Sequence, residues 1–167
     1  MNYRKALPSD IPAMEKLILE EGPNELNFLP EDEIREHLHD ISRGKTEAVL
    51  AEQDGEIEGF VSYVWGKIYP QYEPDELRDN DHGYIAEAVV HRNSAGRGIG
   101  SHLLTMTVDE LGKKGFTRVY AHRHEENIAS ARMLEKAGFE VVDTFYDPER
   151  RPYGSRNTTV CRFVKSE

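Results

Sequence analysis

The sequence has little cysteine and no long apolar run. Its 167 residues include a single cysteine, Cys161, so an intrachain disulfide is excluded and a reducing compartment is the simplest interpretation. No stretch approaches the roughly 20 consecutive apolar residues that a membrane-spanning helix needs. The first residues are not followed by the apolar segment of a signal peptide. We therefore expect a cytoplasmic protein without a membrane anchor.

Basic residues are also scarce. The chain has 21 Lys and Arg against 31 Asp and Glu, which gives a formal net charge of -10. Nonspecific binding to nucleic acid or to anionic lipid needs a basic surface, so we expect neither partner. A local site for one anionic ligand stays compatible with this charge. An acidic surface would attract a cationic substrate, although many proteins are acidic for solubility alone.

Residues at metal-ligand spacing are sparse as well. His122 and His124 alternate near the end of one expected strand, and His37 and His39 form a similar pair on an expected helix. A zinc site needs three or four convergent ligands. No Cys or Glu stands at a suitable spacing from either pair, so we predict surface histidines and no metal.

The periodicity of the apolar residues predicts one mixed α/β domain over residues 1–167, with no repeat and no linker. The expected order is β-α-α-β-β-β-α-β-α-β-β. Asp54-Gly55 is typical of a hairpin turn. The expected strands cover residues 2–7, 48–53, 57–68, 84–91, 116–121, 139–146 and 158–165. The expected helices cover residues 11–21, 31–42, 99–114 and 127–137.

The most informative segment runs from Val89 to Ser101, where a strand enters a glycine-rich turn and a helix leaves it. Glycines let backbone N–H groups approach a ligand closely, and the first N–H groups of a helix favour an anion. A P-loop would need a lysine before Ser101, and the dinucleotide fingerprint would need glycine at position 101. A phosphate cradle and a plain strand-to-helix turn both remain open on this segment alone.

Two motifs resemble the GNAT superfamily of N-acetyltransferases. Ala95-Gly96-Arg97-Gly98-Ile99-Gly100 is similar to its pyrophosphate motif, Gln/Arg-x-x-Gly-x-Gly/Ala, with Ala95 departing at the first position. Arg97 or Arg92 would partly replace that missing charge. Residues 127–139, from Asn127 to Gly138-Phe139, look like the second cofactor motif of the family. The resemblance implies a central, mostly antiparallel, splayed mixed sheet of about seven strands with helices on both faces.

The resemblance also implies the ligand and the residues that hold it. Acetyl-CoA would be the co-substrate, and its acetyl group would pass directly to a primary amine of a small molecule or peptide. The backbone of Val89 or Val90 would donate a hydrogen bond to the oxyanion. The family often forms homodimers, so the resemblance allows one here. The remaining cofactor contacts expected from the two motifs are Arg97, Gly98, Ile99, Gly100, Ser101, Asn127 and Ser130.

Glu87 is the predicted general base, because it lies in an otherwise apolar strand where a carboxylate is costly unless it is paired or functional. The alternative is a solvent-facing or ion-paired strand residue. The acid is less well defined, since Leu134 stands where many family members carry a tyrosine. Tyr146 is the stand-in that we name, with Tyr153 and His124 as alternatives. A thiolate can also leave without an acid.

The acceptor side gives conflicting signals. Residues 20–36 and 73–81 are rich in acidic side chains, which favours a cationic amine, whereas Arg150, Arg151 and Arg156 favour an acceptor that carries a carboxylate. The departures at Ala95 and Leu134 also leave room for a noncatalytic acyl-CoA-binding sensor on the same fold.

Overall fold

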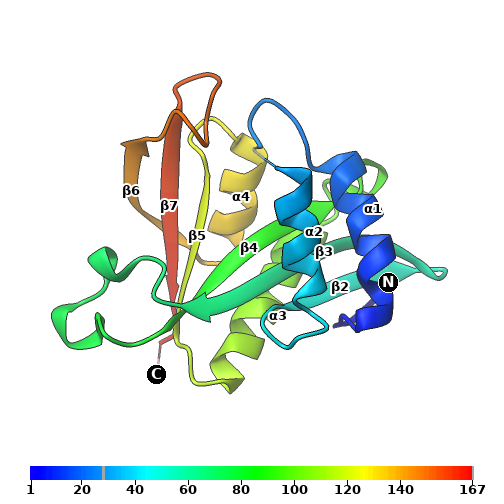
Figure 1. Ribbon diagram of the computed structural model, residues 1–167, viewed down its shortest axis with the longest axis horizontal. Coiled ribbons are helices and arrows are strands. Elements are labelled where there is room, and N and C mark those ends of the chain that lie inside the picture. The colour runs from blue at the N-terminus through cyan, green and yellow to red at the C-terminus, as the bar shows by residue number, and fades with distance from the viewer. Residues whose placement is uncertain (28, 167) are drawn as a thin grey trace.

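The computed structural model describes residues 1–27 and 29–166. Within these residues seven strands form one sheet, with helices on both of its faces (Figure 1). The element order is the one expected from the sequence, and the ends agree within about three residues. The strands are β1 (Asn2–Lys5), β2 (Glu47–Gln53), β3 (Glu56–Gly66), β4 (His82–Val90), β5 (Arg118–His124), β6 (Glu140–Tyr146) and β7 (Asn157–Val164). The helices are α1 (Ile11–Glu21), α2 (Glu31–His39), α3 (Ile99–Lys113) and α4 (Ile128–Lys136).

The strands lie in the order β1-β2-β3-β4-β5-β7-β6. Only the β4–β5 pair is parallel, so the sheet is mixed and mostly antiparallel, as predicted. Asp54 and Gly55 connect β2 to β3 with φ angles of 54° and 81°, which are the two positive values of a tight hairpin turn. The hairpin therefore forms where the sequence predicted it.

The sheet is splayed between β4 and β5. These strands pair only through Gly83 with Val119 and Tyr84 with Tyr120. Just beyond Tyr84, the register between β3 and β4 shifts, so that Ala86 is an extra residue on β4. A bulge of this kind bends a strand and increases its twist. In Figure 1, β4 turns away with β2 and β3, while β5 continues beside β7 and β6.

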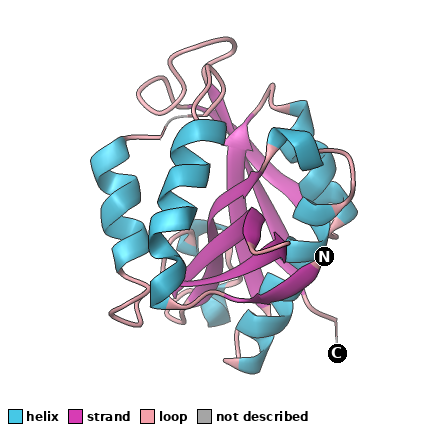
Figure 2. Ribbon diagram, turned by 90° about the vertical axis from the view of Figure 1, so that its right-hand side faces the viewer, coloured by secondary structure: helices cyan, strands magenta, loops and turns pink. Residues whose placement is uncertain are grey.

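Two apolar layers pack against opposite faces of the sheet. Helices α1 and α2 cover one face (Figure 2), where Met14 and Leu38 pack with Leu50 and Phe60 of the sheet. Helix α3 covers the opposite face, where Leu103 and its neighbours pack against β2 and β3. The alternation of inward residues along β2 follows from the two-residue period of a strand. Val49 and Ala51 thus face α3, and Ala48 and Leu50 face α1 and α2.

Helix α2 is shorter than expected. The helix predicted to reach Ser42 ends at His39, because the carbonyl of Asp40 accepts the N–H groups of Lys45 and Thr46 and closes the chain into a turn. Gly44 in that turn has a φ of 74°, a value that suits glycine. None of the helices in the described residues is both long and apolar enough to cross a membrane.

Candidate functional site

A cavity of about 650 Å³ opens where β4 and β5 diverge, and we call it the central cavity. Its walls come from the segment joining α1 to α2, from α2, from the two diverging strands, from α4 and from the segment joining β6 to β7. A cavity of this size suits a small ligand or one arm of a larger one. Its main polar lining residues are Asn27, Glu33, His37, Tyr84, Glu87, His122, Arg123, Ser130, Asp147, Glu149, Arg150 and Arg151.

Glu87 lies on the β4 wall of the central cavity, opposite Ser62 of β3. Burial raises the pKa of this carboxyl to about 8, although the positive charge of Arg151 acts in the opposite direction. No ion pair or hydrogen bond holds the Glu87 side chain within the described residues. The sequence singled out this residue, and the structure places it in the wall of the central cavity. Its role as a general base stays a prediction.

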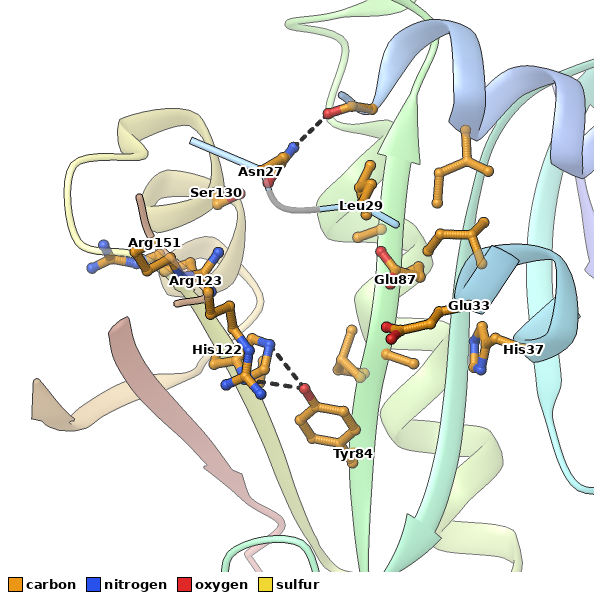
Figure 3. Close-up of a pocket in the computed structure, with 18 of the residues that line it drawn as sticks. Asn27, Leu29, Glu33, His37, Tyr84, Glu87, His122, Arg123, Ser130 and Arg151 are labelled. Carbon is orange, nitrogen blue, oxygen red and sulfur yellow. Dashed lines mark hydrogen bonds between the residues drawn. The ribbon is translucent and has the colours of Figure 1, made fainter. Parts of the chain in front are cut away.

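Helix α2 adds two polar groups to the same wall. Figure 3 shows Glu33 and His37 beside Glu87. His37 Nε2 lies 2.8 Å from the hydroxyl oxygen of Ser62, and burial lowers the pKa of the imidazole. His37 is therefore a neutral ring at neutral pH, and Glu33, one helical turn earlier, is the acidic neighbour of Glu87.

The β5 wall carries a group that sequence reasoning missed. The Tyr69 hydroxyl lies 2.8 Å from His122 Nδ1, and the Tyr84 hydroxyl lies 3.0 Å from His122 Nε2. Burial, with Arg150 and Arg151 nearby, lowers the pKa of His122 to about 3. The ring is neutral, and burial raises the pKa of Tyr84 as well. These residues lie far apart in sequence, so the periodicity of apolar residues could not predict that they are in contact.

The expectation of surface histidines was wrong for the pair on β5. His124 is 1% exposed, its Nε2 lies 2.8 Å from the carbonyl oxygen of Tyr153, and its Nδ1 accepts the N–H of Glu126. His122 is enclosed by two tyrosines. The loop before β7 and the segment before β4 cover this strand end, which the strand's own sequence does not reveal. Within the described part of the chain, no group of His, Cys, Asp and Glu has the arrangement of a metal site.

The glycine turn has the geometry of an anion cradle. Gly96 and Gly98 have φ angles of 78° and 77°, and α3 begins directly after Gly98. The first α3 bond runs from His102 N to the Gly98 carbonyl, so the N–H groups of Ile99, Gly100 and Ser101 have no helical acceptor. Their dipoles favour a negative group at this end of the helix.

Close packing against α4 fixes the position of the cradle. A methyl group added at Gly100 would collide with Met133 Sδ, and the Ser101 hydroxyl donates to the Met133 carbonyl over 3.2 Å. Only the backbone N–H of Ser101 is then free for a ligand. A methyl group at Gly98 would lie 3.3 Å from Lys136 Nζ, so this ammonium lies over the turn. Lys136 is a phosphate-binding candidate that the sequence did not indicate.

The second predicted cofactor segment lies beside the first. Asn127 Oδ1 accepts the Ser130 N–H over 3.2 Å and caps α4, which gives Asn127 a structural role. Ser130 lines the central cavity. The structure therefore brings Ser130 to the gap between the strands, where its hydroxyl faces the same space as Glu87.

The backbone direction distinguishes Val89 from Val90. The N–H of His91 donates to the Glu58 carbonyl on β3 over 2.7 Å. Along a strand the N–H groups point alternately to the two edges. The N–H of Val90 therefore points away from β3, toward the gap beside β5, and that of Val89 points toward β3.

The residues proposed as acids do not gather at the central cavity. Tyr146 is 66% exposed on β6 and is absent from the cavity lining, and Tyr153 is also exposed. Leu134 is 4% exposed and packs in the core beneath α3. Ala95 is exposed and closes the short turn before the glycines. The role of Tyr146 stays a prediction without support from its position.

Comparisons with known proteins agree with this geometry. The sequence model of the acetyltransferase (GNAT) family matches residues 11–139. GCN5-related N-acetyltransferase 6, chloroplastic, from Arabidopsis thaliana is 32% identical over 65 residues, which is 39% of this chain and 23% of that protein. The match thus spans less than a quarter of that relative.

Solved structures share the fold along nearly the whole chain. A ribosomal-protein-alanine N-acetyltransferase from Brucella melitensis has a TM-score of 0.73 at 20% identity, covering 98% of this chain and 99% of that one. A Salmonella typhimurium protein solved with its cofactor acetyl-CoA has a TM-score of 0.70 at 20% identity, covering 100% and 95%. At this identity the likeness establishes the fold.

The cradle can be tested with a glycine pair. Gly98→Ala places a Cβ at a φ of 77° beside Lys136 and should weaken acetyl-CoA binding at least about tenfold. Gly115→Ala is the matched control, because Gly115 has a φ of 97°, open space around it and a place at the far end of α3. Calorimetric titration of both variants measures the effect. Equal affinities would show that the cradle does not bind the co-substrate.

The partly buried carboxyl of Glu87 predicts a pH-dependent stability. In the unfolded chain Glu87 would ionise near ~4.3, whereas in the folded chain its pKa is about 8. The folded state therefore loses stability as pH rises through this window, on the order of a few kcal/mol at most. Glu87→Gln lacks that loss, so the difference in free energy of unfolding, variant minus wild type, should increase between about pH 5 and about pH 8. Denaturant unfolding measures both free energies at each pH. A difference that stays constant across this range would contradict the assignment.

Proposed function

The chain belongs to the acetyltransferase (GNAT) family, and we propose that it is an N-acetyltransferase that moves the acetyl group of acetyl-CoA directly to a primary amine of a small molecule or peptide. One observation carries the proposal. The central cavity holds the carboxyl of Glu87 and lies next to the anion cradle at the start of α3, because Met133 of α4 both lines the cavity and packs against Gly100. An acyl-CoA and an amine need those two features together.

The cradle would hold the pyrophosphate of the co-substrate. The N–H groups of Ile99, Gly100 and Ser101 have no helical acceptor and would bind the phosphates, with Lys136 adding a positive charge beside Gly98. Ala95 lacks the side chain that the family prefers, so the backbone and Lys136 carry more of this binding. Acetyl-CoA supplies a thioester, whose carbonyl is the electrophile of the reaction.

Glu87 would remove the proton from the incoming amine. An alkyl ammonium has a pKa near ~10.4, so a carboxylate of ordinary pKa is a weak base for it. The pKa of about 8 brings Glu87 much closer to that value and to neutral pH, which is the range in which a general base works well. A bound ammonium would in turn favour the ionised carboxylate.

Val90 would stabilise the charge that develops on the thioester oxygen. Its N–H points into the gap and comes from a strand held on its other edge by β3, so the donor is fixed in place before the reaction. The thiolate would leave without an acid at position 134, since Leu134 is apolar. The raised pKa of Tyr84 makes that hydroxyl a poor proton donor, although it lines the cavity.

The remaining expectations accompany this proposal. A cytoplasmic enzyme that needs no metal and acts without nucleic acid or membrane partners is consistent with the charge of -10. The noncatalytic sensor is the alternative, and the released thiol separates it from an enzyme. A homodimer is left as an expectation from the family.

The pH profile of turnover tests the base. With acetyl-CoA saturating, kcat/KM for the amine should rise with pH through an ionisation near about 8, because Glu87 must lose its proton. Glu87→Gln should lower kcat by about 10²- to 10⁴-fold while leaving acetyl-CoA affinity unchanged. Thiol release measured across pH gives both quantities.

Two results would contradict these assignments. Wild-type turnover in Glu87→Gln would remove Glu87 from the mechanism and leave the transferase intact. Acetyl-CoA binding without thiol release, across a broad amine panel, would favour the sensor.

A further inference from the structure

The two walls of the central cavity carry opposite charge. Figure 3 shows Glu33 and Glu87 on the side of α2 and β4, and Arg123 and Arg151 on the side of β5 and the loop after β6. Arg150 lines the cavity beside Arg151, and Asp147 and Glu149 complete the charged lining. A ligand that fills this space meets Glu33 and Glu87 on one side, and on the other side three arginines that outnumber the two carboxylates beside them.

Arg151 is the buried arginine of the cavity wall. It is 5% exposed, its Nε donates to the Thr158 hydroxyl over 3.0 Å, and it forms no ion pair in the part of the chain that the structure describes. The nearby carboxylate of Asp147 is engaged by Arg150 and by the Thr158 hydroxyl. A charged side chain buried without an ion pair is costly unless an anion joins it.

Other arginines of the chain show the contrast. Arg4 and Arg43 form ion pairs with Asp10 and Asp40, and these partners raise the pKa of each guanidinium. Burial and the neighbouring Arg150 instead lower the pKa of Arg151. The guanidinium is thus held in the cavity wall without an ion pair, and the nearby Asp147 carboxylate only partly offsets its charge.

We propose that the acetyl acceptor is a small amino carboxylate, whose ammonium binds at Glu87 and Glu33 and whose carboxylate binds Arg151. This inference rests on the proposed transferase activity and adds the substrate class to it. A guanidinium offers two parallel N–H groups to a carboxylate, so one planar anion would satisfy Arg151. Arg150 stays paired with Asp147 and contributes longer-range attraction.

The reaction follows with all atoms accounted for. The ammonium gives one proton to the Glu87 carboxylate, and the amine nitrogen then forms a bond to the thioester carbonyl carbon as the C–S bond breaks. As the amide forms, the nitrogen passes its second proton to the leaving sulfur, directly or through water, and CoA departs as the thiol. The acceptor carboxylate does not react. The ion pair between this carboxylate and Arg151 places the amine near Glu87.

The test compares matched acceptors on the wild-type protein. The panel contains glycine, alanine, methionine, β-alanine and γ-aminobutyrate, the carboxamide of each, spermidine, and a short peptide with a free N-terminus and an amidated C-terminus. Thiol release gives kcat/KM for every acceptor. At least one amino carboxylate should exceed its own carboxamide by at least about tenfold.

Variants then assign the preference to Arg151. Arg151→Gln should bring the ratio of acid to amide near one, with the KM for acetyl-CoA unchanged. Arg151→Lys, which keeps the charge and loses the two-pronged geometry, should restore part of the ratio. Arg156→Gln is the control, because Arg156 is an exposed arginine of the same loop outside the cavity lining, and it should keep the wild-type ratio.

Each contrary result has one meaning. Amides, spermidine or the peptide turning over as well as the acids would overturn the amino carboxylate assignment and leave the transferase standing. A rise in the KM for acetyl-CoA in Arg151→Gln, with the acid-to-amide ratio kept, would assign Arg151 to the co-substrate and overturn the inference. No thiol release with any acceptor would refute the transferase proposal and this inference with it.

Discussion

The site depends on one constraint, which is that β4 and β5 pair through only two residue pairs before they separate. The extra residue at Ala86 turns β4 away, and the bonds that would have joined the strands are replaced by an opening. The apolar layer beneath α3 contains residues from both sides of the opening, so it fixes the two halves of the sheet relative to one another. An interrupted sheet thus supplies free backbone donors, such as the Val90 N–H, in a rigid setting.

Charge burial gives that opening its chemistry. Glu87 and Arg151 are each enclosed without an ion-pair partner in the described residues, and they face the same cavity from opposite walls. Each is costly to the folded protein when the cavity holds no ligand, and each is relieved by a group of the opposite charge. A substrate with both charges would relieve both, which couples recognition to catalysis. The ligand-free protein is therefore less stable than it would be with apolar residues at these positions, and its site is already arranged for the substrate.

Sequence patterns predicted the elements that obey local rules. The strand over residues 48–53, the Asp54-Gly55 turn and the glycine turn before α3 each reflect a local backbone requirement, and each was confirmed. Glu87 was visible because a carboxylate in an apolar strand is costly wherever that strand lies. The Tyr69–His122 contact and the position of Lys136 over Gly98 were not visible, because segments distant in sequence create them. His124 was predicted on the surface for the same reason.

The most direct test of the proposed mechanism is to measure the pKa of Glu87 itself. Carbon-13 NMR of the protein with labelled glutamate, with Glu87→Gln to assign the signal, follows the carboxyl through a pH titration. The account predicts a pKa of about 8 for Glu87. A value near the ordinary ~4.3 would mean that the carboxyl is solvated, and the central cavity would then lack the base on which the proposed transfer depends.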